Sequence, residues 1–214
     1  MQHLFLSSSA DDIGVADSIY RRLGLNSPRT AFIYTPVEAE AQIGMKTWEG
    51  EERQALNKAG FNTFDYTITG KNLDQIKLDL KDIEVLYISG GNECYFREMC
   101  DNSHFEDFVK EYVGSGKPYI GTSCGAIMAT EDISPTSKLN DLSILKHPLN
   151  PSGFGLVNFS ILPHWGLPDF KKEYIEDSFD TLYQQSRPLI ALNNYQYIEV
   201  VGDTWQIVDV RSEL

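Results

Sequence analysis

The first two-thirds of the chain alternates short apolar runs, rich in β-branched residues, with longer stretches of helical periodicity. The runs at 3–8, 30–36, 61–68 and 83–91 have the composition of buried strands. The stretch at 11–25 carries its apolar residues at helical spacing. This alternation is typical of βα units arranged around a parallel sheet, and it predicts an α/β fold.

The same pattern continues up to about residue 130. We expect a helix rich in Glu, Lys and Arg between Val37 and Ala59, and helical structure over 93–114 with a break near the CDNS sequence. The KPYIG sequence at 117–121 predicts a short buried strand.

After residue 131 the periodicity weakens. Residues 131–155 are rich in Ser, Pro, Asn and Asp, and loops of this length inside compact domains are usually functional. No internal repeat or linker divides the chain, so we predict a single domain over residues 1–214. Beyond the loop we expect a strand ending at Pro163, a helix over 169–185, and three short strands with a turn at Gly202-Asp203.

Charge and cysteine content limit the partners and the compartment. Eighteen Lys and Arg against thirty-one Asp and Glu give a net charge of −13, which repels phosphate backbones and anionic membrane surfaces. The apolar run near the N-terminus is too short for a signal peptide, and no run approaches the roughly 18 apolar residues of a membrane span. Three cysteines without a C-x-x-C pair indicate neither a disulfide framework nor a zinc site. We expect a soluble cytoplasmic protein, monomeric or homodimeric, that binds no nucleic acid, membrane or metal.

The sequence GTSCG at 121–125 is the main candidate for a catalytic motif. It fits the Gly-x-Ser-x-Gly pattern, with Gly121, Ser123 and Gly125 in the fixed positions. A nucleophile on a sharp strand-to-helix turn has strained backbone geometry, so the residues two positions away must be small. The helix that begins behind the turn directs backbone N–H groups toward the reacting centre. We therefore predict a nucleophile elbow.

Two adjacent residues of this motif, Ser123 and Cys124, could each act as the nucleophile. The glycine spacing favours Ser123, because a register centred on Cys124 would place the β-branched Thr122 where a small residue is needed. The backbone N–H of Cys124 would then belong to an oxyanion hole. Gly90 and Gly91 end another predicted strand and offer further N–H donors, although an ordinary turn also explains this pair. Their expected place beside the elbow favours the oxyanion hole.

A serine hydroxyl needs a base to remove its proton and an acid to orient that base. His164 follows a strand directly, so it should emerge at the carboxyl edge of the sheet beside Ser123. A structural or capping histidine fits this position equally well. The other histidines, His3, His104 and His147, lie in a strand, among helical polar residues, and before a proline of the long loop.

For the acid we choose Asp141, which lies on the loop between the elbow and the histidine strand. This choice gives the chain order Ser, Asp, His that is also found in α/β hydrolases. Glu131, Asp132 and Asp169 are close enough in sequence to remain alternatives.

Taken together, these segments resemble the dipeptidase E family of serine peptidases, the α-aspartyl dipeptidases, within the class I glutamine amidotransferase-like superfamily. The resemblance covers nearly the whole chain, through LFLSSS, YISGGNECYF, YIGTSCGAIMA, LNDLSI and FGLVNFSILPHWG. It implies a three-layer, doubly wound, mostly parallel sheet of flavodoxin-like type. It also implies the following roles: Ser123 as nucleophile, His164 as base, Asp141 after Asn140 as acid, Gly91 in the oxyanion hole, and Gly90 and Asn92 as weaker substrate contacts.

The chain also departs from related proteins. Related amidotransferases have a Cys nucleophile and a Glu two residues after the histidine, whereas this chain has Ser123 and Gly166. Dipeptidase E has an arginine after the histidine that binds the aspartyl carboxylate, whereas HWGLPDFKKEYIED contains no Arg. Lys171 and Lys172 are the available cations there, but an ammonium does not reproduce the bidentate grip of a guanidinium.

These observations predict a serine peptidase that hydrolyses short peptides through an acyl-enzyme intermediate and without a cofactor. Asp-X dipeptides are the first substrates to test. Two alternatives remain open: an esterase or amidase that uses the same residues on a non-peptide acyl substrate, and an inactive binding module of the same fold.

Overall fold

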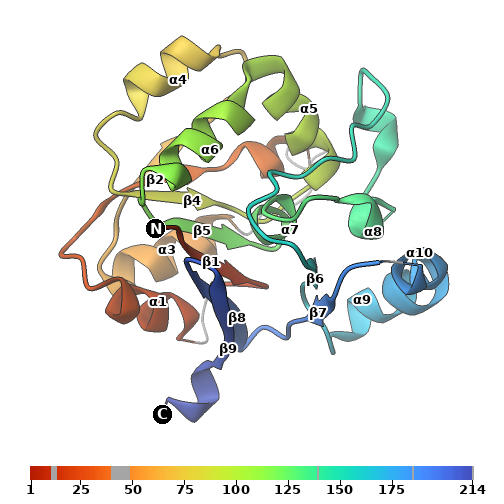
Figure 1. Ribbon diagram of the computed structural model, residues 1–214. Coiled ribbons are helices and arrows are strands. Elements are labelled where there is room, and N and C mark those ends of the chain that lie inside the picture. The colour runs from red at the N-terminus through yellow and green to blue at the C-terminus, as the bar shows by residue number, and fades with distance from the viewer. Residues whose placement is uncertain (11–13, 40–48, 139, 185, 214) are drawn as a thin grey trace.

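A seven-stranded sheet forms the centre of the computed structural model, which describes residues 1–10, 14–39, 49–138, 140–184 and 186–213 (Figure 1). The strand order is β3-β2-β4-β5-β1-β8-β9. The first five strands in this order are parallel, whereas β8 and β9 are added antiparallel at one edge. The predicted mostly parallel α/β sheet is therefore confirmed. The bounds are β1 His3–Ser7, β2 Arg29–Ile33, β3 Asn62–Tyr66, β4 Val85–Ile88, β5 Tyr119–Thr122, β8 Gln196–Val201 and β9 Thr204–Asp209.

Helices cover both faces of this sheet and make the three predicted layers (Figure 1). Side chains alternate along β1, so Leu4 and Leu6 join one buried cluster while Phe5 joins the other. The cluster around Leu4 packs against helices that include Phe96, and the cluster around Phe5 packs against helices that include Ile19. The helices on the first face are α4 Leu73–Asp79, α5 Glu93–Ser103 and α6 Phe105–Gly114, and those on the second are α1 Val15–Leu23 and α3 Glu49–Ala59.

Most predicted helices agree with the structure, with differences at their ends. The break expected near CDNS falls at His104, whose left-handed backbone, with φ of 57°, separates α5 from α6. The sequence pattern did not predict α4, in which Ile76 is the buried residue. The N-terminal ends expected for the first two helices fall partly on 11–13 and 40–48, which lie outside the described residues.

The strand before His164 is not part of the main sheet, which corrects the prediction. Its residues Ser160–Leu162 form β6 and pair in parallel with β7, Leu189–Ala191, as a separate two-stranded sheet. Figure 1 shows this small sheet beside the carboxyl end of the main one, next to the helical segment that follows. That segment, expected as one helix over 169–185, consists of α9 Pro168–Lys172, a π-helical turn Glu173–Asp177 and α10 Phe179–Tyr183.

The long loop over 131–155 is held down by buried charged residues of α5. Glu98 accepts hydrogen bonds from the backbone N–H groups of Lys146 and His147, both at 2.8 Å. Arg97, whose side chain is only 2% exposed, donates to the carbonyl of Ser152. Short helical turns within the loop, α8 Ser134–Ser137 and a 3-10 turn Leu142–Ile144, interrupt an otherwise irregular path.

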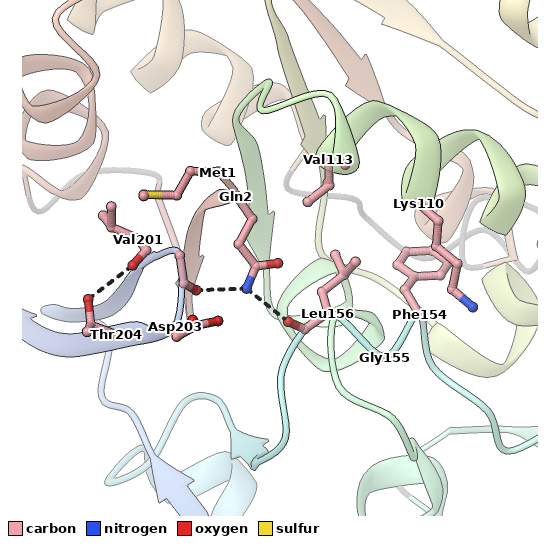
Figure 2. A pocket seen from close by; sticks show the side chains of 12 residues that line it. Met1, Gln2, Lys110, Val113, Phe154, Gly155, Leu156, Val201, Asp203 and Thr204 are labelled. Carbon is pink, nitrogen blue, oxygen red and sulfur yellow. Dashed lines mark hydrogen bonds between the residues drawn. The ribbon is translucent and has the colours of Figure 1, made fainter.

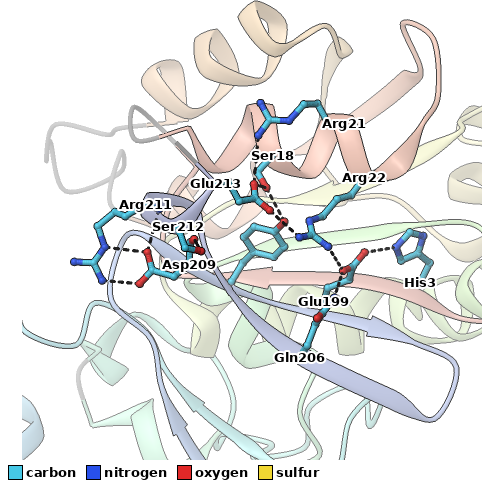
Figure 3. A network of polar contacts seen from close by, with 11 residues as sticks. His3, Ser18, Arg21, Arg22, Glu199, Gln206, Asp209, Arg211, Ser212 and Glu213 are labelled. Atoms are coloured by element: carbon cyan, nitrogen blue, oxygen red, sulfur yellow. Dashed lines mark hydrogen bonds and ion pairs between the residues drawn. The ribbon is translucent and has the colours of Figure 1, made fainter.

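The C-terminal end is anchored to α1 by a network of charges (Figure 3). The carboxylate of Glu213 accepts hydrogen bonds from Ser18 at 2.6 Å and from Arg22 at 2.7 Å. Arg22 also donates to Glu199 of β8, which in turn contacts His3 of β1. His3 is thus engaged in this network at the start of the interior strand β1. None of the helices in the described ranges is long and apolar enough to cross a membrane.

Candidate active site

Ser123 lies on a sharp turn between β5 and α7, the helix Cys124–Met128. Its backbone has φ of 46° and ψ of −105°, a conformation that non-glycine residues rarely adopt. The Ser123 N–H donates to the Ser7 carbonyl at the end of β1, which fixes the turn against the neighbouring strand. Strain that surrounding structure maintains in this way is characteristic of functional positions.

The two flanking glycines are required by close backbone contacts. A Cβ atom on Gly121 would lie 2.4 Å from the carbonyl oxygen of Gly125. A Cβ atom on Gly125 would lie 2.3 Å from the carbonyl oxygen of Ile88 in β4. The Gly125 oxygen belongs to α7 and the Ile88 oxygen to the sheet, and because neither backbone can move far, both positions exclude any side chain. The spacing of the GTSCG motif therefore follows from how tightly α7 folds back over β4 and β5.

His164 follows β6 and reaches the serine. Its Nε2 lies 3.1 Å from Ser123 Oγ, which is hydrogen-bonding distance. Its backbone has φ of 60°, and its N–H donates to the Oγ of buried Ser8, which itself donates to the Leu192 carbonyl. The Phe170 ring stacks on the imidazole at a centroid distance of 4.6 Å. The position of His164 is thus fixed by three contacts: Ser8 at its backbone, Phe170 on one ring face and Ser123 at Nε2.

The other ring nitrogen of His164 contacts Asn194, which the sequence reasoning missed. Nδ1 lies 2.9 Å from Oδ1 of Asn194, in the turn between β7 and β8. An amide oxygen accepts hydrogen bonds only, so Nδ1 is the donor in this contact, and in the neutral imidazole Nε2 is then the unprotonated nitrogen facing Ser123. That is the tautomer a general base requires. In the sequence, Asn194 stands in NNYQ at 193–196, directly after the segment of β7. This short sequence indicates a turn, but it contains no motif that would link Asn194 to a histidine.

Asp141, predicted as the acid, makes its described contacts with Ser143. Its carboxylate is exposed and accepts hydrogen bonds from Ser143, which lower the pKa of Asp141. The described contact at Nδ1 of His164 belongs to Asn194. The alternative acids also have other surroundings: Glu131 pairs with Arg187, Asp132 caps Ser134, and Asp169 is exposed in the first turn of α9.

Gly91 and Cys124, predicted to form the oxyanion hole, lie after β4 and at the start of α7. A Cβ atom on Gly91, where φ is 127°, would lie 2.5 Å from the Pro36 carbonyl, so the close approach of two backbones requires glycine. Cys124 is fully buried and begins α7, directly after the serine. Gly90 precedes Gly91 in the turn that follows β4. Asn92 caps α5 through Oδ1, which accepts the Tyr95 N–H, so its role in the structure is helix capping.

Glu93 is a buried carboxyl group directly after this glycine segment. It is 3% exposed, and burial raises its pKa to about 7, although its own backbone N–H and hydrogen bonds with Asn140 and Thr136 oppose the shift. Asn140, rather than Asp141, is therefore the member of the Asn-Asp pair that contacts an interior group. No sequence pattern had singled out Glu93, since a Glu in the first turn of a helix is usually solvated.

A pocket of about 480 Å³ adjoins His164. Lys171 lines it, whereas Lys172, the other predicted cation, is not among its lining residues. A larger hollow of about 1020 Å³ lies at the opposite edge of the sheet, around Met1, Gln2 and the β8–β9 turn (Figure 2). The parallel strands end at Ser123 and begin near Gln2, so this hollow is remote from the elbow. Within the described ranges, His, Cys, Asp and Glu residues form no group of three suited to a metal ion.

A serine on a strained elbow, with Nε2 of a histidine at hydrogen-bonding distance, is the arrangement that serine-type hydrolases use. The chain belongs to peptidase family S51, whose sequence profile matches residues 4–208. It is thus a serine-type peptidase of the dipeptidase E type, as the sequence predicted.

Individual relatives agree with this assignment. An uncharacterized peptidase of Listeria innocua is 25% identical over 94% of this chain and 93% of its own length. Peptidase E of Nostoc is 31% identical over 77% of this chain and 66% of its own length. A crystal structure from Listeria monocytogenes, provisionally assigned to peptidase E, has a TM-score of 0.85 and 22% identity, covering 98% of both chains, and shows the same fold.

Proposed function

We propose that this peptidase hydrolyses short peptides with Ser123 as nucleophile, His164 as general base and Asn194 as the residue that orients the imidazole. The observation that carries the proposal is the 3.1 Å contact between Ser123 Oγ and His164 Nε2 on the strained elbow. A serine hydroxyl becomes an effective nucleophile only when such a base removes its proton.

In the proposed reaction, Ser123 Oγ attacks the scissile carbonyl while Nε2 of His164 takes its proton. The backbone N–H groups of Gly91 and Cys124 stabilise the oxyanion of the tetrahedral intermediate. The imidazolium then returns the proton to the leaving amine, which departs and leaves an acyl-serine. A water molecule, deprotonated by His164, hydrolyses this ester and regenerates the serine.

Asn194 gives this site a neutral orienting group in place of a carboxylate. The amide oxygen holds the Nδ1–H and the ring orientation, as Asn does in papain-like Cys-His-Asn sites. A neutral partner stabilises the imidazolium less than Asp would, because it supplies a dipole rather than a full charge. We expect Asn194 to act mainly through position and tautomer.

The test is turnover of a dipeptide panel, with Asp-X dipeptides as reference substrates, by the wild type, Ser123→Ala and Cys124→Ala. Ser123→Ala should lose at least about 10³-fold in kcat, in line with the removal of a nucleophile. Cys124→Ala is the matched neighbour and should keep most activity, since its proposed role uses only the backbone. Equal rates for the wild type and Ser123→Ala contradict the proposal, and loss of activity in Cys124→Ala alone makes the cysteine the nucleophile.

A serine-reactive phosphonate separates the remaining alternatives. Labelling at Ser123 together with fast turnover of p-nitrophenyl acetate, but of no peptide, indicates an esterase. A protein that is inert to both the phosphonate and the substrates is a binding module of this fold.

A further inference from the structure

The pocket beside His164 has walls that are mostly apolar. Its volume is about 480 Å³, within the range of roughly 300–1,000 Å³ that holds small ligands. It is lined by His164 and by the segment that follows it, including Trp165, Leu167, Phe170 and Ile175. The wall is continuous with the proposed catalytic base, because the Phe170 ring stacks directly on the imidazole.

Three of these side chains are unusually exposed for large apolar residues. Trp165 is 44%, Leu167 39% and Ile175 46% accessible, although apolar surface of this kind is normally buried. Single exposed apolar residues are common, but several that line one concave surface indicate a binding site. The turn that carries Trp165 and Leu167 includes Gly166, whose φ of 93° favours glycine, and it ends at Pro168, where α9 begins; Ile175 lies in the π-helical turn after α9.

Charge plays a small part in this pocket. Among the described residues that line it, Lys171 is the one lysine or arginine, and no carboxylate is present. Lys171 is exposed, so its ammonium stays hydrated and gains little from pairing with an anion, while its methylene stem extends the apolar wall. The walls therefore favour an apolar occupant over an acidic one.

We propose that this pocket binds a large aliphatic or aromatic side chain of the peptide substrate, on a residue next to the cleaved bond. The inference rests on the proposed function, since it takes Ser123 and His164 as the reacting pair. A carbonyl placed at Ser123 Oγ brings the residues on both sides of the scissile bond close to the imidazole, and the pocket adjoins that imidazole. The preferred substrates are accordingly apolar short peptides rather than Asp-X dipeptides.

The experiment measures kcat/KM of the wild type for Phe-Ala, Leu-Ala, Ala-Phe, Ala-Leu, Ala-Ala and Asp-Ala. One apolar series should exceed both Ala-Ala and Asp-Ala by about tenfold or more, the usual discrimination of an apolar pocket. The two series differ only in the position of the large residue, so they identify which side of the cleaved bond the pocket serves.

Two variants assign the preference to this pocket. Ile175→Ala and Leu167→Ala should each lower the ratio of the apolar to the Ala-Ala rate by about threefold or more. Ile207→Ala is the matched control, because Ile207 is 45% exposed on β9 and does not line the pocket, and it should leave the ratio unchanged. Circular dichroism spectra that match the wild type verify that each variant is folded.

The outcomes separate this inference from the proposed function. Cleavage that depends on Ser123 but is fastest for Asp-Ala, or equal across the panel, overturns the apolar pocket and leaves the peptidase mechanism intact. The same holds for an apolar preference that Ile175→Ala and Leu167→Ala leave unchanged. Absence of any Ser123-dependent peptide cleavage overturns both.

Discussion

Glu93 gives the stability of this protein a pH dependence that the structure predicts in sign and size. Its carboxyl group is buried at the start of α5, and desolvation raises its pKa from 4.5 to about 7. In the unfolded chain the group is hydrated and titrates near its ordinary value. The folded state therefore binds more protons than the unfolded state between these two pH values.

The sign of this pH dependence follows from the difference in proton binding between the folded and unfolded states. Stability falls with rising pH wherever the folded state holds the extra proton, so the contribution of Glu93 is fully present below about pH 4.5 and is lost as pH rises through about 7. At about 1.4 kcal/mol for each pKa unit, the full effect is about 3 kcal/mol. Most of it, about 2 to 3 kcal/mol, falls between pH 5 and pH 8.

The perturbation that isolates this effect is Glu93→Gln, which keeps the shape of the side chain and stays neutral at every pH. The assay is urea unfolding of the wild type and the variant at pH 5, 6, 7 and 8. Relative to the wild type, the variant should gain about 2 to 3 kcal/mol in free energy of unfolding between pH 5 and pH 8. Glu51→Gln, an exposed change on α3, is the control and should produce no such trend.

One result would refute the reasoning about Glu93. If the difference in stability between the wild type and Glu93→Gln stays constant within about 0.5 kcal/mol from pH 5 to pH 8, the carboxyl group does not hold its proton in the fold. A constant offset would then report only the packing and hydrogen bonding of the new amide.

Three further predictions concern the site and its supports. Asn194→Ala should lower kcat by about 10²-fold or more with little change in KM, because the histidine loses its orienting acceptor. Asn194→Asp should retain substantial activity. Steady-state kinetics measure both variants, and an unchanged kcat in Asn194→Ala contradicts the proposed role of Asn194. Gly125→Ala should lower the free energy of unfolding by about 2 kcal/mol or more in urea, because the new methyl group meets a backbone oxygen of β4. The control is Gly114→Ala at the end of α6, where a methyl group has open space, and this change should be neutral or slightly stabilising. Glu213→Gln should lower the free energy of unfolding by less than about 1 kcal/mol at pH 7, because the hydrogen bonds of Glu213 with Ser18 and two arginines, which lower its pKa, are near the surface. The difference should disappear in acid, where the wild-type carboxylate is protonated. A difference that persists at low pH contradicts the assigned charge pairing.

The sequence contained enough information for the layered architecture and for the sharp turn at Ser123. The run 83–91, which contains β4, is short and mostly apolar and ends in two glycines, and this local composition indicates burial without reference to distant residues. The elbow was predictable for the same reason. Its glycines are dictated by contacts within one strand-turn-helix unit and the adjacent strand, so Gly121 and Gly125 leave a readable spacing around Ser123.

The partners of the histidine could not be predicted in this way. Asp141 was chosen from chain order and charge, but the turn that holds Asn194 comes to Nδ1 of His164 because β6 and β7 pair in a small separate sheet. That pairing joins segments about 30 residues apart and has no local signature. Ser8, which supports the His164 backbone, is likewise brought there from the other end of the chain.

Sequence alone thus determined the fold class and predicted the nucleophile and the base, since each prediction rests on composition and spacing over a few neighbouring residues. The tertiary structure decided that an amide contacts Nδ1 of His164, that Glu93 is buried with a raised pKa, and that an apolar pocket adjoins His164. These features depend on which distant segments meet. Solvation and hydrogen bonding of a side chain are set by the neighbours that the fold supplies, and the sequence near that side chain does not contain them.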